Sequence, residues 1–198
     1  MNRKTVVARN LVIGFLAMGL SGCAAVVVGG AAATTATVAH DRRTTGTFVE
    51  DQEIFLRALS MYNGDEELGR KSKISISVYG MQVLLIGQAE NMEIVESFRQ
   101  RVATIPRVRT VFNEVAVGAE STFSESTSDA YLTARVKVAL FDVRIKGFDP
   151  TRVKVSSSLG SVYLMGLLTP TEADAVTEKV RFVSGVKRVV KLFEYLDE

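Results

Sequence analysis

The sequence predicts an α+β fold made of two copies of one small unit. Two segments match each other at a spacing of 78 to 79 residues, which is the signature of an internal repeat. In the first copy, two short apolar strands at 74–78 and 83–87 precede a helical stretch at about 90–104 and a β-rich run at 107–115. The corresponding segments of the second copy are 153–157, 162–166, about 171–183 and 186–193. A shorter helix precedes each copy, at about 50–62 and 128–141.

Each copy therefore has the order helix, strand, strand, helix, strand. The first two strands lie only a few residues apart around Gly80 or Gly160, so they form a hairpin. The last two strands are joined through a helix, which makes them parallel with a right-handed crossover. We expect a mixed three-stranded sheet with two helices on one face in each copy. We also expect Gly87 and Gly166 to serve the turn from strand to helix.

The first residues have the three parts of a secretory signal peptide. A positive start (Arg3, Lys4, Arg9) is followed by a short apolar core at 11–20 and by small residues before Cys23. The ending resembles a lipobox, so we expect removal of 1–22 and acylation of Cys23. By the same resemblance, Ala24 in place of an aspartate favours the outer membrane and its periplasmic face. The alternatives are a transmembrane anchor across the uncharged stretch 11–39, and a structural cysteine.

The remaining composition excludes one class of partner and describes the segment after Cys23. The whole chain has 24 Lys+Arg against 22 Asp+Glu, and loss of the three signal-peptide cations leaves 21 against 22. A nucleic-acid binder normally has a strong basic excess, so no nucleic-acid partner is expected. Residues 23–47 are rich in Ala, Gly, Thr and Val, and we interpret them as a lipidated flexible tether.

The sequence contains little that could carry catalysis. Its single histidine is His40 and its single cysteine is Cys23, so a zinc site built from several such ligands is excluded and no metal or cofactor is expected. A Ser-His-Asp triad would need His40 to reach a folded core from the tether. The acidic run 65–67 lies beside Gly64 in an expected loop and is better explained as solvated charge than as a glycosidase pair. We therefore expect no enzymatic activity.

The helix that precedes the second copy is apolar on two sides. On a helical wheel, a core stripe is formed by Leu132, Val136, Ala139 and Leu140. A second stripe on roughly the opposite face consists of Tyr131, Ala134, Val138 and Phe141, with Arg135 and Lys137 beside it. An exposed apolar stripe with aromatic residues and basic flanks is typical of a helix that lies in a membrane interface. These six residues are the candidate phospholipid-binding site, and packing against the first copy is the alternative.

Two other groups of residues have a less specific pattern. The first copy's helix also has apolar residues off its core stripe (Phe55, Leu56, Leu59), but it begins with acidic residues that an anionic surface would repel. We assign this face to domain packing or to a protein partner. Lys187, Arg188 and Lys191 lie on the last strand, either as a solvated face that discourages edge pairing or as a secondary phosphate contact.

A family resemblance rests on the repeat. Val162-Tyr-Leu-Met-Gly166, a helix, and then Val183-Ser-Gly-Val-Lys-Arg-Val189 look like the BON domain, a bacterial periplasmic module often found in tandem. The first copy departs from the motif, with Ile105-Pro106-Arg107-Val108 in place of Val-Ser-Gly-Val, so its turn geometry is open. The resemblance divides the folded part into a first BON domain at 48–118 and a second at 124–196.

Together with the signal peptide and lipobox, the two units resemble the dual-BON outer-membrane lipoproteins of the DolP (YraP) type. That resemblance implies a non-enzymatic role in outer-membrane integrity, with phospholipid binding by a BON domain. Because Arg135 and Lys137 lie beside the apolar stripe, the expected partner is an anionic phospholipid membrane, with phosphatidylglycerol or cardiolipin. The expected function is an outer-membrane lipoprotein that binds anionic phospholipid through its second BON domain. The alternative is a protein-interaction scaffold that docks an outer-membrane assembly partner through the same stripe or through the first copy's helix.

Overall fold

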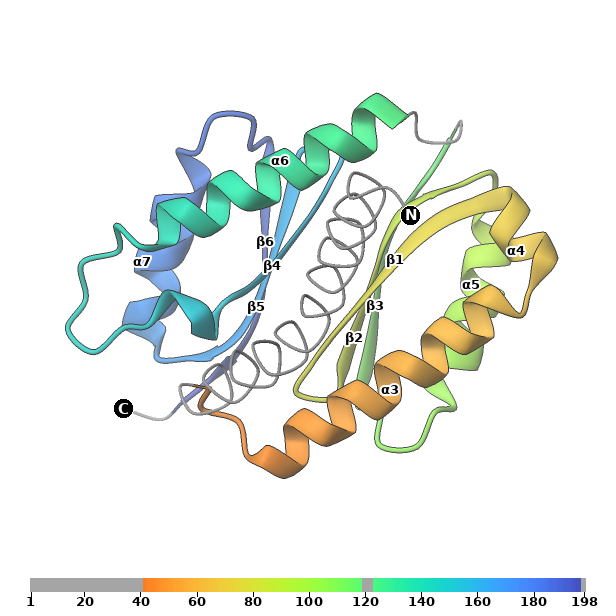
Figure 1. Ribbon diagram of the computed structural model, residues 1–198, viewed down its shortest axis with the longest axis horizontal. Coiled ribbons are helices and arrows are strands. Elements are labelled where there is room, and N and C mark those ends of the chain that lie inside the picture. Colours follow the sequence, from red (N-terminus) through yellow and green to blue (C-terminus); the bar gives the residue numbers. More distant parts are fainter. Residues whose placement is uncertain (1–40, 119–122, 197–198) are drawn as a thin grey trace, which may run out of the picture. The chain divides into compact units, whose positions relative to one another are not determined.

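The computed structural model describes residues 41–118 and 123–196, which contain two repeats of one fold (Figure 1). The signal peptide, Cys23 and His40 lie outside the described residues. The first repeat contains α3 (Thr45–Asn63), α4 (Glu66–Lys71), β1 (Ser72–Tyr79), β2 (Gln82–Ala89), α5 (Met92–Ala103) and β3 (Thr110–Val117). The second contains α6 (Phe123–Leu140), the 3-10 turn η1 (Pro150–Arg152), β4 (Lys154–Ser158), β5 (Ser161–Leu168), α7 (Pro170–Arg181) and β6 (Arg188–Tyr195).

The predicted mixed three-stranded sheets are confirmed. In the first sheet β1 pairs antiparallel with β2, and β2 pairs parallel with β3. The second sheet repeats this arrangement with β4, β5 and β6. In both repeats the central strand is the second in the chain, because the hairpin sets one neighbour and the helical crossover sets the other.

One aspartate per repeat joins the first helix to the hairpin turn. Asp51 of α3 accepts hydrogen bonds from the backbone N–H groups of Gly80 at 2.8 Å and Met81 at 2.6 Å. Asp129 of α6 accepts from Leu159 at 3.0 Å and Gly160 at 3.4 Å. All four turn residues have positive φ, as a two-residue hairpin turn of this kind requires. The carboxylate thus satisfies amides that the tight turn leaves without a strand partner.

Gly87 and Gly166 do not serve the strand-to-helix turns, so that expectation was wrong. Both lie inside the central strands β2 and β5. A Cβ at Gly87, where φ is +130°, would lie 2.0 Å from the Lys73 carbonyl oxygen, and a Cβ at Gly166 would lie 2.9 Å from that of Arg152. Glycine is needed here because a neighbouring backbone approaches closely.

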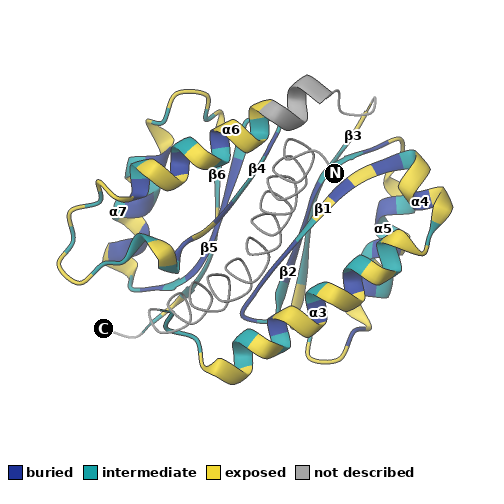
Figure 2. Ribbon diagram, in the orientation of Figure 1, coloured by how far each residue is buried: buried dark blue, intermediate teal, exposed yellow. Residues whose placement is uncertain are grey.

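Each sheet is covered by helices on one face. α3 and α5 contact β1, β2 and β3, while α6 and α7 contact β4, β5 and β6. The largest buried side chains of the first core include Phe98, Ile54 and Leu85, and those of the second include Leu140, Leu164 and Leu168. Figure 2 shows the consequence for the helices, which are buried where they face the sheet and exposed on their outer sides.

The opposite faces of the two sheets share a third buried cluster. It consists of Tyr79, Leu84 and Ile86 from the first sheet with Tyr163 and Met165 from the second. Hydrogen bonds also cross this contact. For example, the Leu167 amide donates to the Tyr79 hydroxyl at 3.1 Å, and Lys154 Nζ donates to the Val78 carbonyl at 2.9 Å. The repeats therefore pack through their sheets.

The helix α3 begins at Thr45, inside the segment 23–47 that the sequence analysis assigned to the tether. The Thr44 side chain caps it by accepting from the Thr47 amide at 3.1 Å. Just before the cap, Arg42 makes a two-pronged ion pair with Glu172 of α7, at 2.5 and 2.8 Å. Residues from Asp41 onward therefore belong to the folded part, because these contacts fix them to it.

Arg43 sits where the two repeats meet. Its guanidinium stacks on the Tyr79 ring with its Cζ 3.8 Å from the centroid, and it pairs with Asp41 and with the buried Asp51. Burial, together with the Asp41 carboxylate, raises the pKa of Tyr79 to about 12. Burial and the charge of Arg43 lower the pKa of Lys154. Arg43 thus lies beside two carboxylates inside a contact that largely excludes solvent.

The acidic run 65–67 begins a helix rather than lying in a loop. Asp65 caps α4 by accepting from the Leu68 amide at 2.9 Å, and Glu66 and Glu67 occupy the first turn. Negative residues are favourable there because they face the positive end of the helix dipole. Asp65 also pairs with Arg101 at 2.6 Å. The run is therefore structural.

Candidate membrane-binding site

The outer face of α6 is apolar and open to solvent. The exposed fractions are 66% for Tyr131, 71% for Val138 and 68% for Phe141, which follows the last residue of the helix. Ala134 and Lys137 are also exposed, and Arg135 is half-buried. The core stripe is buried against the sheet through Leu132, Val136 and Leu140. The helix therefore presents two apolar faces, of which one has no packing partner within the part of the chain described.

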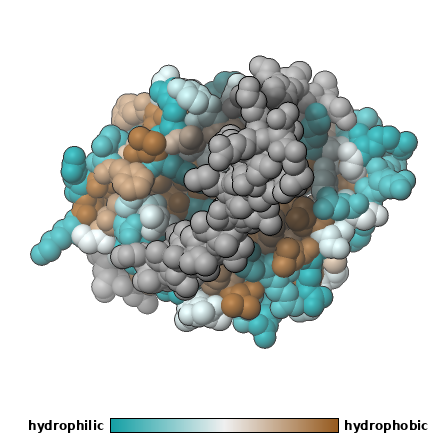
Figure 3. All heavy atoms as spheres, in the orientation of Figure 1, coloured by the Kyte–Doolittle hydropathy of each residue, from teal (hydrophilic) through white to brown (hydrophobic). Residues whose placement is uncertain are grey.

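The alternative explanation for this stripe was packing against the first repeat. The contact between the repeats is instead made by the sheet faces, through Tyr79, Leu84 and Tyr163. In Figure 3, hydrophobic residues are visible at the left of the view, over the region that Figure 1 labels α6. The stripe is thus a surface feature of the folded part.

Phe182 extends this surface and was not among the residues predicted from sequence. It is the C-cap of α7, is 71% exposed, and its ring lies 4.7 Å from Cζ of Arg181. With Tyr131, Ala134 and Val138 it lines a groove of about 750 Å³ between α6 and the end of α7. A helical wheel of 171–183 would have revealed it, because Phe182 falls opposite the side that carries the buried Ala173, Val176 and Val180.

The basic residues of α6 have no acidic partner in the part of the chain that the structure describes. Arg135 lies near the ring of Tyr131, with Cζ at 5.6 Å from the centroid. Within the described residues, neither Arg135 nor Lys137 forms an ion pair. Their positive charge is therefore free to meet an external anion.

The corresponding face of α3 is different. Arg57 occupies the place of Arg135, but it pairs with Glu53 at 2.8 Å, and Glu53 occupies the place of Tyr131. Phe55 is half-buried and packs against its own core. Leu56 and Val49 are exposed. The first repeat thus has a neutralised outer face with two separate apolar residues.

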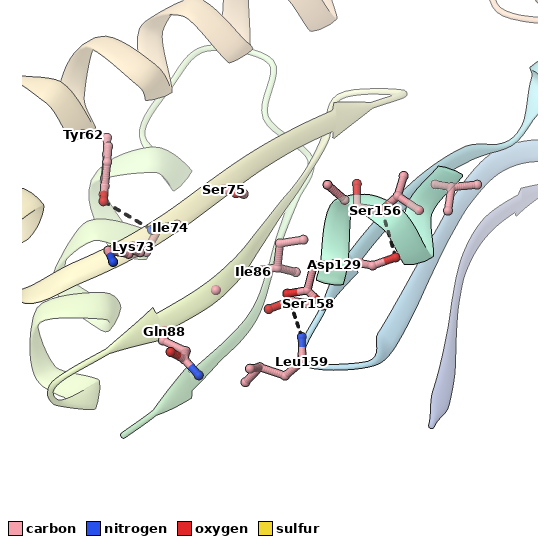
Figure 4. Close-up of a pocket in the computed structure, with 15 residues that line it drawn as sticks. Tyr62, Lys73, Ile74, Ser75, Ile86, Gln88, Asp129, Ser156, Ser158 and Leu159 are labelled. Atoms are coloured by element: carbon pink, nitrogen blue, oxygen red, sulfur yellow. Dashed lines mark hydrogen bonds between the residues drawn. The ribbon is translucent and has the colours of Figure 1, made fainter. Parts of the chain in front are cut away.

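A second cleft, of about 550 Å³, lies where β1 and β2 of the first repeat face α6 and β4 of the second (Figure 4). Several of its polar groups are hydrogen-bonded within the cleft. The Tyr62 hydroxyl accepts from the Ile74 amide at 3.2 Å, Asp129 accepts from Leu159, and Thr133 donates to Ser157 at 3.0 Å. This cleft is accordingly a polar part of the contact between the repeats.

Two further properties of the described residues bear on the site. Among them, no helix is long and apolar enough to cross a membrane. Nor does any group of three or more His, Cys, Asp and Glu side chains in that part of the chain come together in a way that could hold a metal ion.

Comparison with known proteins agrees with the fold. The family model of the BON domain matches residues 128–197, the second repeat. The mixed sheet, its helices and this match define the chain as a BON-domain protein.

The chain is 36% identical over 179 residues to the outer membrane lipoprotein DolP of Haemophilus influenzae (strain ATCC 51907 / DSM 11121 / KW20 / Rd), covering 90% of this chain and 91% of that protein. It therefore belongs to the DolP family of outer membrane lipoproteins. It is also 33% identical over 157 residues to a protein of Actinobacillus pleuropneumoniae named 21 kDa hemolysin, covering 79% of each.

Among solved structures, the C-terminal domain of CdsD, a structural protein of the type III secretion system of Chlamydia trachomatis, aligns with a TM-score of 0.27 and 14% identity. The alignment covers 74% of this chain and 67% of that one. This likeness is too low to bear on function.

Proposed function

We propose that this protein is a non-enzymatic lipoprotein of the outer membrane that binds anionic phospholipid through the outer face of α6 and supports the integrity of the envelope. One observation carries the proposal. Tyr131, Val138 and Phe141 form an exposed apolar stripe on a helix whose opposite side is already buried in a core. Beside the stripe, Arg135 and Lys137 have no acidic partner among the described residues.

This arrangement suits a membrane interface in both of its parts. The aromatic rings enter the boundary of the acyl chains, while the cations remain at the level of the lipid phosphates. Partial burial of Tyr131 and Phe141 is worth about 2–4 kcal/mol. Each basic residue near an anionic surface adds about 1 kcal/mol. The resulting binding is weak for a free protein but sufficient for one that is anchored in the same membrane.

The anchor is part of the proposal. Removal of residues 1–22 and acylation of Cys23 would hold the protein on the periplasmic face of the outer membrane, and the name of the Haemophilus relative, a lipoprotein, supports this. The folded part begins at Asp41, so 17 residues lie between Cys23 and its first residue. The lipid keeps α6 near the bilayer without requiring tight binding.

We further infer that the first repeat, expected at residues 48–118, is also a BON domain, diverged in sequence from the matched one. The strand order and pairing are the same as in the matched repeat. Arg107 has φ +71° at the position where the second repeat has Gly185 with φ +98°, so the turn before the last strand keeps its geometry despite the departure from the motif. Asp51 and Asp129 bind the hairpin turns in the same way.

The test is co-sedimentation of residues 24–198, which retain the compact unit from Asp41 to Glu198, with vesicles. Phosphatidylglycerol-containing and zwitterionic vesicles are compared at low and moderate salt. We expect binding that requires the anionic lipid and weakens with salt. Tyr131→Asp removes this binding. Leu56→Asp is the matched control, because Leu56 is 61% exposed on the equivalent helix of the first repeat.

Absence of binding by the folded wild type overturns the proposal and favours a protein-interaction scaffold, for which the exposed Val49 and Leu56 of α3 are the candidate surface. Equal loss of binding in Tyr131→Asp and Leu56→Asp overturns the assignment to α6. Release of an encapsulated dye is followed in the same vesicles, because one relative is named a hemolysin. The proposal expects binding without release.

A further inference from the structure

A cleft of about 360 Å³ lies at one side of α6, where that helix meets two loops of its own repeat. Tyr131 and Arg135 line it from α6, Gly160 from the β4–β5 turn, and Ser184 and Lys187 from the loop between α7 and β6. Its volume is within the range of about 300–1,000 Å³ that is common for small-ligand pockets.

This cationic cleft adjoins the apolar groove of the candidate membrane site. Tyr131, Arg135 and Ser184 line both, so the two share a wall. The groove continues over Val138 and Phe182, which are the most exposed large apolar residues of the second repeat. A polar, positively charged pocket joined to an apolar groove matches an amphiphile, which has a charged head on an apolar body.

Lys187 is held at the rim of the cleft. Its amide donates to the Gly160 carbonyl at 2.9 Å, and its side-chain stem lies so close over Gly160 that a Cβ there would come within 2.9 Å of Lys187 Cδ. Within the described residues neither Lys187 nor Arg135 forms an ion pair. Asp129 also lines the cleft, but its two oxygens are occupied by the amides of the hairpin turn.

The first repeat fills the corresponding place with its own carboxylate. Arg107, the counterpart of Gly185, pairs with Glu50, the counterpart of Ser128. Arg109, the counterpart of Lys187, pairs at 2.9 Å with Glu194, which belongs to β6 of the second repeat. The second repeat has Ser128 in place of Glu50 and Gly185 in place of Arg107, so both members of that ion pair are absent. Lys187 and Arg135 line the cleft instead, and neither forms an ion pair within the described residues.

We propose that this cleft holds the phosphate of a phospholipid head group, with Arg135 and Lys187 as its cationic contacts and the Ser128 and Ser184 hydroxyls as neutral donors. The acyl chains then leave along the groove past Phe182. This inference rests on the proposed membrane function and assigns a specific head-group site within it. Lys187, which is distant in sequence from α6, becomes a lipid-binding residue.

The experiment is an NMR titration of residues 24–198 with monomeric dihexanoyl phosphatidylglycerol and, separately, with inorganic phosphate, alongside the vesicle assay. The lipid is expected to shift the amides of Gly160, Ser184 and Gly185. Lys187→Gln should lower affinity for phosphatidylglycerol vesicles about five-fold, the effect of one lost basic contact at an anionic surface. Lys191→Gln is the matched control, because Lys191 is an exposed lysine four residues further along the same segment.

A second pair of variants tests whether a carboxylate at position 128 competes with the lipid for the cations of the cleft. Ser128→Glu places a carboxylate where the first repeat has Glu50, and it should reduce the lipid-induced shifts and vesicle affinity as Lys187→Gln does. Ser128→Gln has a side chain as large as that of Ser128→Glu but carries no charge, so it should reduce both clearly less than Ser128→Glu does, and equal reductions would contradict the role given to the charge.

The outcomes separate this inference from the proposed function. Vesicle binding that is lost in Tyr131→Asp but equal in Lys187→Gln and Lys191→Gln overturns the head-group site and leaves the membrane function standing. Wild type that does not bind vesicles overturns both. Amide shifts with inorganic phosphate but none with dihexanoyl phosphatidylglycerol assign the cleft to free phosphate and overturn the lipid assignment.

Discussion

The helices α3 and α6 occupy the same place in the two repeats but present different outer faces. Their inward residues correspond closely, with Ile54 and Ala58 of α3 matched by Leu132 and Val136 of α6. On the outer face, Glu53 of α3 is replaced by Tyr131 in α6. One fold is thus maintained by the inward positions, while the outward positions determine whether the helix carries a neutral salt-bridged surface or an amphipathic one.

The difference extends to how each repeat uses its cations. In the first repeat Arg57, Arg99, Arg101 and Arg107 all have carboxylate partners. In the second, Arg135, Lys137 and Lys187 have none within the described residues. A surface whose charges are internally paired gains little from an anionic membrane, whereas unpaired cations gain Coulomb energy there. At the equivalent positions Arg57 and Arg135 the cation is the same, and the difference lies in the acid, because Tyr131 stands where the first repeat has Glu53.

The largest expected contrast between the repeats concerns the aspartates that bind the hairpin turns. Asp51→Ala should lower the free energy of unfolding by about 4 kcal/mol, because Asp51 is buried and pairs with the buried Arg43 in addition to two amides. Asp129→Ala should cost about 1 kcal/mol, since Asp129 holds only the two amides and is half-buried. Urea denaturation at neutral pH measures both. Equal losses would contradict the asymmetry between the two sites.

The glycines of the central strands give the next contrast. Gly87→Ala should cost about 3 kcal/mol, because the new Cβ would lie 2.0 Å from a backbone oxygen at a φ of +130°. Gly166→Ala should cost about 1 kcal/mol, since the approach is 2.9 Å and the backbone conformation is ordinary. The midpoints of urea unfolding test this order, and Gly69→Ala, at a helix position with open space, is the control. A larger loss in Gly166→Ala than in Gly87→Ala would show that the two close approaches have been ranked wrongly.

Conversion of the α6 face into that of α3 sharpens the comparison directly. Tyr131→Glu recreates the Glu53–Arg57 arrangement, because it places a carboxylate four residues before Arg135. The change removes a 66% exposed aromatic and neutralises a cation, so binding to phosphatidylglycerol vesicles should fall by about 2 kcal/mol, roughly 30-fold.

The matched control for this conversion is Glu53→Gln in α3. It should leave vesicle binding unchanged because α3 lacks the apolar stripe. Tighter binding by Glu53→Gln would show that freeing a single arginine is enough, and the role assigned to Tyr131 would be lost.

Much of this architecture was predictable from sequence, because the repeat exposed it. The strand order, the hairpins and the two-sided apolar pattern of α6 follow from periodicity alone. The packing role of Gly87 could not be predicted from the sequence, because the close approach of the Lys73 backbone is a tertiary contact that leaves no local sequence signal. The same reason applies to Arg42 and Arg43, whose partners lie up to 130 residues away. The head-group cleft was equally inaccessible, since Lys187 and Arg135 meet only through the fold.

The smallest expected effect concerns the ion pair that joins the start of the folded part to the second repeat. Burial alone would raise the pKa of Glu172, but the hydrogen bonds from Arg42 and the Thr169 amide lower it below its ordinary value. A carboxyl whose pKa is lower in the folded state stabilises the protein above its unfolded pKa, and this contribution is lost as the pH falls through the folded pKa.

Arg42→Gln should therefore lower the free energy of unfolding by about 1 kcal/mol at neutral pH, with the difference from wild type shrinking as the pH falls below 4.5. Urea unfolding at a series of pH values measures the difference, and Arg57→Gln, in an exposed ion pair within α3, should show almost no change. A difference that grows with acidification would mean that Arg42 acts through something other than the Glu172 carboxylate, because only a protonating partner makes its contribution vanish in acid.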